Sequence, residues 1–178
     1  MENIQYRQIG INEKEILDEI FRLRVICRKG SEYINFKKFP NGWFDDMDFY
    51  SNHFAAFNNN ELIGSGRITI LNTIKEHPYY PALENIIPKY LLLPPIAYLS
   101  RDQVLETFAG RGIRRRLLND REDLCRMLNI SDLFIDVALN GNQYNNFTND
   151  GYIEIGQFET DKIHWDLGES ILMHKKLL

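Results

Sequence analysis

The sequence lacks most of the features that define several large protein classes. Only two of its 178 residues are cysteine, which excludes a disulfide-rich secreted scaffold. The longest apolar run, residues 90–99, is half the roughly 20 residues that a membrane-spanning helix needs, and it contains two prolines. The first ten residues, MENIQYRQIG, are polar where a signal peptide has its apolar segment. We therefore expect a cytoplasmic protein that does not span a membrane.

The composition is that of a globular protein. Hydrophobic residues make up 44% of the chain and charged residues 26%, which excludes disorder, collagen and coiled coil as descriptions of the whole chain. The length predicts a single domain over residues 1–178. Cys27 and Cys125 lie in helix-like patterns, which favours buried small hydrophobic residues. His53 and His164 lack the spacing of metal ligands, so we expect no metal site.

Positive charge is concentrated in one segment. The net charge is −4, yet residues 101–126 contain seven arginines against five acidic residues. Four of these arginines (Arg111, Arg114, Arg115 and Arg116) crowd the first turn of a helix that we expect over residues 113–128. The amino end of a helix is already positive, so this cluster behind Gly110 and Gly112 favours a bound anion such as phosphate.

Three other interpretations of the arginine cluster stay open at this stage. Some of the arginines can be solvated or can pair with acidic residues in the next turns of the helix. The segment lacks the glycine patterns of the P-loop and of dinucleotide-binding proteins, so neither pattern identifies the phosphate ligand. Nucleic acid is a further candidate ligand, but so local a charge favours one small anion, and we expect no nucleic-acid partner.

Hydrophobic periodicity and turn residues predict the order of the secondary structure. Asn12 and Glu15 have the spacing of a capping box at the start of a helix that ends near Gly30. An irregular polar and aromatic segment extends to Asp48, and Asn58–Asn60 predicts a hairpin turn. We expect strands at residues 3–8, 53–57, 62–70, 96–105, 133–139, 152–158 and 170–176, a proline-rich connection over 72–95 and a short helix or turn at 142–150.

Residues 99–113, with the sequence LSRDQVLETFAGRGI, resemble the acyl-CoA-binding core of the GNAT N-acetyltransferase superfamily. Further segments resemble other parts of the family in the correct order, so that the likeness covers residues 15–178; these segments are 53–57, 61–67, 133–139, 149–152 and 173–177. The chain departs from the family pattern at Glu106, Ala109 and Arg114, which stand where proline, Arg or Gln, and a small residue are usual.

The resemblance implies an α/β (α+β) fold of GNAT type, with a mixed, mostly antiparallel sheet flanked by helices. The strands at 96–105 and 132–139 should splay apart. It also implies an N-acyltransferase that moves an acyl group from acetyl-CoA, or another acyl-CoA, to a small-molecule or peptide amine. A GNAT-fold protein that binds CoA or another anion without catalysis is the alternative. The resemblance leaves the acyl chain length, the acceptor and the oligomeric state open.

The resemblance also assigns residues. The acyl-CoA site would comprise Gln103, Val104, Leu105, Gly110, Arg111, Gly112, Ile113, Arg114 and Arg115. The backbone N–H of Val104 or Leu105 would face the thioester oxygen. Phe147 occupies the position of the family's acidic tyrosine, and Tyr144, one helical turn earlier, is the nearest substitute; otherwise it is a partly exposed helix residue.

Two carboxylates are candidates for the general base, Glu106 after the strand and Asp136 within the next strand. The alternative for Asp136 is a position that faces solvent. Upstream, the acidic residues of the segment 43–49 lie among aromatic residues. Asp45, Asp46 and Asp48 could form a mouth that receives a cationic amine, or they could belong to a solvated acidic loop.

Overall fold

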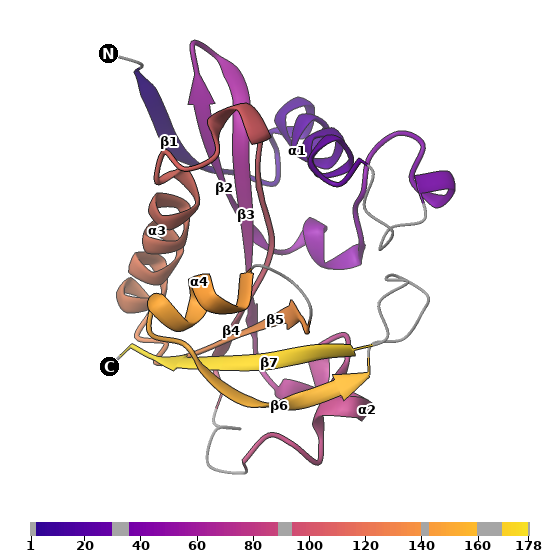
Figure 1. The fold of residues 1–178 in the computed structure, drawn as a ribbon, viewed down its shortest axis with the longest axis vertical. Coiled ribbons are helices and arrows are strands. Elements are labelled where there is room, and N and C mark those ends of the chain that lie inside the picture. The colour runs from indigo at the N-terminus through magenta and orange to yellow at the C-terminus, as the bar shows by residue number, and fades with distance from the viewer. Residues whose placement is uncertain (1–2, 30–35, 89–93, 140–142, 160–168, 178) are drawn as a thin grey trace. The chain divides into compact units, whose positions relative to one another are not determined.

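The computed structural model describes residues 3–29, 36–88, 94–139, 143–159 and 169–177 (Figure 1). In chain order its helices and strands are β1 (Ile4–Ile9), α1 (Lys14–Cys27), β2 (Asn52–Asn58), β3 (Glu61–Leu71), α2 (Tyr80–Leu83), β4 (Ile96–Val104), α3 (Ile113–Met127), β5 (Asp132–Ala138), α4 (Gln143–Asn149), β6 (Ile153–Glu159) and β7 (Glu169–Lys176). Short 3-10 helices lie between them, among them η2 (Asp46–Phe49) and η5 (Glu106–Phe108).

The strands are hydrogen-bonded in the order β1-β2-β3-β4-β5-β7-β6. The ladders β1–β2, β2–β3, β5–β7 and β6–β7 are antiparallel, and β4–β5 is parallel. This mixed, mostly antiparallel sheet with helices confirms the expected fold class.

The chain divides into two compact units. The first comprises the chain up to Thr69 together with Ser100–Leu124, and the second comprises Ile70–Leu99 with Cys125–Leu178. In each of β3, β4 and α3, the two ends therefore belong to different units. The single domain over residues 1–178 stays a prediction.

In the first unit, α1 packs against the β1–β2–β3 ladder. The predicted hairpin turn is confirmed: Asn59 and Asn60 have φ of 47° and 68° between β2 and β3, as a type I′ turn requires. The apolar side of α1 meets the sheet in a core of Ile9, Leu17, Ile20, Phe21, Leu23, Ala55, Phe57 and Leu62.

The predicted cap of the first helix is wrong. The helix begins at Lys14, with Glu13 rather than Asn12 as the N-cap residue, and no side chain caps it. The Glu13 carboxylate instead accepts the backbone N–H of Gly10 at 2.8 Å and the guanidinium of Arg7 at 2.7 Å. These two contacts form a turn ahead of the helix, and the capping-box spacing of Asn12 and Glu15 is not used.

In the second unit, β5 lies between β4 and β7. In the described part of the chain, the parallel β4–β5 ladder covers only Ala97–Leu99 against Leu133–Ile135, although both strands continue beyond it. The pairing of these two strands thus ends where the expected splay begins. On the other side, β5 pairs with β7 along its whole length.

Membrane-spanning segments were sought among the described residues. None of the helices there is both long enough and apolar enough to cross a bilayer.

Candidate functional site

The loop from β4 to α3 is hydrogen-bonded to β3 at its start and has open space beside its two glycines. The backbone N–H of Leu105 donates to Ile63 O of β3 at 2.9 Å. Gly110 and Gly112 then have φ of +75° and +77°, and a Cβ built on either would meet no atom within 4 Å. Glycine is therefore required here by the left-handed backbone rather than by crowding. The loop leads into the first turn of α3, whose N–H groups have no partner within the helix.

The four arginines of this segment have different surroundings. Arg111 is exposed, donates to Thr107 O at 3.1 Å and lies over the ring of Phe108. Arg116 pairs with Asp120 at 2.8 Å in the next turn, so the ion-pair interpretation holds for this residue. Of the other two, Arg114 is half-buried and Arg115 is exposed.

Two glycines of β3 let the end of β4 and the start of α3 approach closely. A Cβ on Gly64 would lie 3.1 Å from Ile113 Cγ2 and 3.2 Å from Gln103 O. Gln103 and Ile113 are both buried. The second glycine, Gly66, leaves room for an ion pair described below, so this part of the predicted acyl-CoA site has a tightly packed base.

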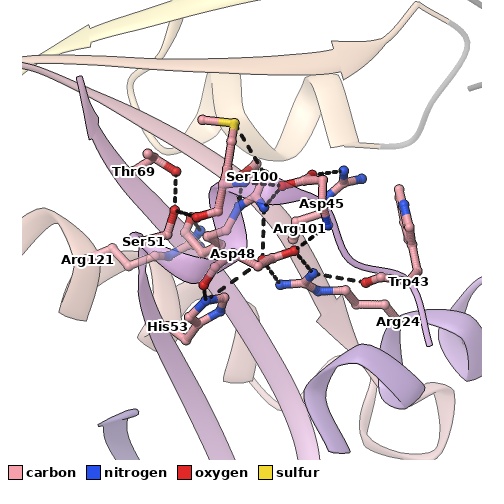
Figure 2. A network of polar contacts seen from close by, with 12 residues as sticks. Arg24, Trp43, Asp45, Asp48, Ser51, His53, Thr69, Ser100, Arg101 and Arg121 are labelled. Carbon is pink, nitrogen blue, oxygen red and sulfur yellow. Dashed lines mark hydrogen bonds and ion pairs between the residues drawn. The ribbon is translucent and has the colours of Figure 1, made fainter. Parts of the chain in front are cut away.

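A network of buried ion pairs lies in the same unit (Figure 2). Arg24 of α1 forms two parallel bonds of 2.8 Å with the carboxylate of Asp48 and donates to Trp43 O at 3.0 Å. Arg67 of β3 contacts Asp45 at 2.6 Å and Asp48 at 2.9 Å. Both arginines and Asp48 are at most 1% exposed, so these charges are compensated inside the protein rather than by water.

Arg101 of β4 extends this network (Figure 2). Its guanidinium pairs with Asp45 and lies 3.9 Å from the centre of the Trp43 ring. Its backbone has φ of +61°, an uncommon value for a residue with a side chain. Stacking and ion pairing together hold this conformation, which interrupts the extended backbone of β4 three residues before Val104.

The acidic segment is built into this network. Asp45 caps η2, accepting from the backbone N–H of Met47, while Asp48 accepts the backbone N–H of Asp45, which completes a capping box. The guanidinium groups of Arg24 and Arg67 hold the pKa of Asp48 well below its usual range, against the opposing effect of burial. Neither sequence interpretation therefore describes Asp45 and Asp48.

Asp46 differs from its two acidic neighbours because it is exposed, as a solvated acidic residue should be. The predicted irregular segment is also wrong at this point, where residues 46–49 form η2. A local capping box and distant arginines together order it.

A second ion pair adds to the buried charges of the first unit. Arg121 of α3 lies 2.5 Å from Asp102 and donates to Leu117 O and Arg67 O. A Cβ on Gly66 would lie 2.7 Å from Arg121 Cζ. The pair thus depends on a glycine on β3.

In the second unit, Asp136 lies beside a buried histidine. Asp136 directly follows the last β4–β5 pair, and its Oδ1 is 3.9 Å from His77 Nε2. His77 Nδ1 accepts the backbone N–H of Tyr79 at 3.2 Å, so the proton of the neutral ring is on Nε2. Burial lowers the pKa of His77 to about 3. Asp136 is mostly buried rather than facing solvent.

The two other predicted catalytic residues lie in different surroundings. Tyr144 of α4 donates its hydroxyl to Glu154 Oε2 at 3.0 Å, which raises the pKa of Tyr144. Phe147 is fully buried and packs edge-on against Tyr152. Glu106 is exposed in η5, in the same unit as the β4–α3 loop, whereas Asp136 and Tyr144 belong to the second unit.

Sequence reasoning missed the arginines of the network and His77. One signal was present: Arg24 follows Ile20 by four residues and so falls on the apolar side of α1. Both cysteines are buried or half-buried, as expected. Among the described residues no group of three potential ligands could hold a metal ion, and His164 lies outside those residues.

Comparison with known proteins places the fold. No protein-family model and no curated protein matches the chain. Solved structures do match over almost its full length. FeeM, an N-acyl amino acid synthase from uncultured soil microbes, has a TM-score of 0.70 and 14% identity, over 99% of this chain and 92% of FeeM.

Two further solved structures are similar to this chain to a comparable degree. PaiA N-acetyltransferase from Thermoplasma acidophilum, solved with coenzyme A, has a TM-score of 0.64 and 16% identity over 98% of this chain and 99% of its own. An acetyltransferase of the GNAT family from Staphylococcus aureus Mu50 has a TM-score of 0.67 and 12% identity over 99% of this chain and 100% of its own.

Proposed function

Because this chain has the fold of the GNAT superfamily, we propose that it is an N-acyltransferase that transfers an acyl group from acyl-CoA to an amine. The observation that carries the proposal is the β4–α3 loop. Its two left-handed glycines lead into the first turn of a helix beside arginines, and a Cβ built on either glycine would meet no atom within 4 Å. Such a loop suits a pyrophosphate.

The acyl-CoA residues have complementary roles in this proposal. Backbone N–H groups from Gly110 to Arg114 bind the phosphates, and Arg114 or Arg115 adds charge. Leu105 already donates its N–H to Ile63, which supports Val104 as the donor to the thioester oxygen. A donor at this oxygen stabilises the negative charge that develops when the amine attacks.

The transfer needs a base and an acid. The acceptor ammonium loses a proton to Glu106 or Asp136, and the amine nitrogen then forms a bond to the thioester carbon. The base passes this proton to water and accepts the second proton of the nitrogen as the carbon–sulfur bond breaks. Tyr144 protonates the departing thiolate and regains a proton from water. In this scheme Tyr144 must first release its hydrogen bond to Glu154.

Binding of the donor tests the loop. Calorimetric titration with acetyl-CoA, longer acyl-CoAs and CoA should give saturable binding. Gly112→Asp should weaken it at least tenfold, because a carboxylate would face the phosphates. Gly112→Asn is the matched control, since asparagine has the same shape and tolerates a left-handed backbone but carries no charge. Failure of every acyl-CoA to bind would overturn the proposal.

Turnover tests the chemistry. A panel of amines, incubated with acyl-CoA and monitored for free thiol, should release CoA with at least one acceptor. FeeM is named as an N-acyl amino acid synthase, so the panel should include amino acids. Binding of acyl-CoA without turnover of any acceptor would exclude the enzyme and support a CoA-binding protein.

A further inference from the structure

Arg28 differs from the arginines of the ion-pair network in the partners of its side chain. It follows Arg24 by four residues and terminates α1, so the two side chains lie on the same side of the helix. Arg28 is half-buried, and its Nε is buried with no hydrogen-bond partner. No ion pair joins its side chain to another residue of the described chain.

The surroundings of Arg28 are positive. Burial is the main cause that lowers the pKa of Arg28, and the neighbouring guanidinium of Arg101 lowers it further; Asp102 acts in the opposite direction. Arg101 itself lies on Trp43 and pairs with Asp45. A half-buried guanidinium beside a second one is costly unless an anion joins them.

The aspartates nearest to Arg28 are each held by another arginine. Asp45 pairs with Arg67 and Arg101, Asp48 pairs with Arg24 and Arg67, and Asp102 pairs with Arg121. A planar carboxylate matches the geometry of guanidinium groups.

The position of Arg101 on β4 suits the binding of an acceptor. Arg101 precedes Val104 by three residues on β4, which is about 10 Å along a strand. An anion bound between Arg28 and Arg101 is therefore within the length of a small molecule from the backbone that is proposed to face the thioester. An amine that carries its own carboxylate bridges such a distance.

We propose that the acceptor is an amino acid and that Arg28 binds its carboxylate. This inference rests on the proposed N-acyltransferase function. Arg28 is a specificity residue: it contacts the acceptor and leaves the acyl-CoA site untouched.

The test compares acceptors that differ only at the carboxylate. Rates are measured with an amino acid, its carboxamide and its decarboxylated amine, for one aromatic and one aliphatic side chain. They are expressed per concentration of neutral amine, because the amines differ in pKa. Wild type should have a kcat/KM at least tenfold higher for the amino acid. Equal or better turnover of the carboxamide and the amine would overturn the inference while leaving the N-acyltransferase proposal intact.

Variants assign the preference to Arg28. Arg28→Met should raise the KM for the amino acid by tenfold or more, leave kcat/KM for the decarboxylated amine unchanged and leave acyl-CoA affinity unchanged. Arg28→Lys should recover part of the loss. Arg22→Met, at an exposed position of the same helix, is the control. An equal effect of Arg28→Met on both acceptors, or no effect on either, contradicts the assignment.

A binding experiment separates the two proposals. Titration with the N-acetyl amino acid, which has the carboxylate but cannot be acylated again, should give at least tenfold weaker binding to Arg28→Met than to wild type. If this difference is found and no acceptor turns over, the carboxylate site stands and the N-acyltransferase proposal fails. If amines turn over but wild type and Arg28→Met bind the N-acetyl amino acid equally, the carboxylate site fails.

Discussion

The carboxylate of Asp48 receives two parallel bonds of 2.8 Å from the guanidinium of Arg24, and both side chains are at most 1% exposed. One partner lies in the first helix and the other in η2, 24 residues later. Together with Arg67, this pair fixes the segment after Trp43 against α1 and β3.

Asp48→Asn should destabilise the protein strongly. The variant leaves Arg24 and Arg67 with less negative charge in a buried site, and removal of one partner from a buried ion pair costs about 3–5 kcal/mol. Because the folded-state pKa of Asp48 lies below the unfolded one, its contribution is present above about pH 4 and is lost as the pH falls through the folded pKa. Urea unfolding at several pH values measures both effects.

Asp46→Asn is the control for this experiment, because Asp46 is exposed in the same turn. It should change the free energy of unfolding by less than about 0.5 kcal/mol. Equal effects of the two substitutions would show that the Arg24–Asp48 pair contributes no net stability.

His77→Asn should reduce the loss of stability that occurs as the pH falls below about 6.5. The pKa of His77 is about 3 in the folded protein and near 6.5 in an unfolded chain. Below about pH 6.5 the unfolded state therefore binds a proton that the folded state excludes, which reduces stability by up to about 1.4 kcal/mol per pH unit. Asparagine can still accept the Tyr79 N–H.

The buried His77→Asn variant loses ring packing at every pH, so the slope of stability against pH, rather than its absolute value, is the readout. The slope between pH 6.5 and 3 should be smaller than in wild type. An identical slope would mean that His77 takes up its proton in the folded state as readily as in the unfolded one.

Gly66→Ala should disturb the Arg121–Asp102 pair. The added methyl would lie 2.7 Å from Arg121 Cζ and 2.8 Å from Asp102 Oδ1, closer than real contacts allow. We expect a loss of about 1–3 kcal/mol in the free energy of unfolding. Gly10→Ala, whose methyl would meet only Glu13 Oε1 at 3.7 Å, is the control and should retain wild-type stability in the same denaturation assay.

Tyr144→Phe should lower kcat by roughly 10² to 10⁴, the range typical of general acid catalysis, with little change in acyl-CoA affinity. Pre-steady-state release of thiol measures the step directly. Glu154→Gln keeps an acceptor for the Tyr144 hydroxyl and should retain activity. A Tyr144→Phe variant with wild-type kcat would return Tyr144 to a structural role.

The sequence predicted those parts of the molecule that local rules determine. The Asn59–Asn60 turn follows from residues that tolerate a left-handed backbone, and α3 follows from apolar residues at helical spacing. The glycines of the β4–α3 loop were also identified from the sequence, because a short motif contains them.

The buried charges follow no local rule. The network joins four separate segments, those of Arg24, Asp48, Arg67 and Arg101. Only Arg24 carries a signal of burial in the sequence, because it falls on the apolar side of α1. Their pairing depends on which segments the fold brings together. The same is true of His77 and Asp136, which are 59 positions apart in the sequence. The helix start was mispredicted for the opposite reason, since two adjacent polar residues competed for one local role.

The division of the chain into two units determines when the first unit can fold during synthesis. The first unit needs residues up to Leu124 and the second needs both the middle and the end of the chain. Neither unit is one continuous stretch of the polypeptide, so a ribosome has produced most of the chain before the first unit is complete. Until then the nascent hairpin of β2 and β3 lacks the residues from β4 onward.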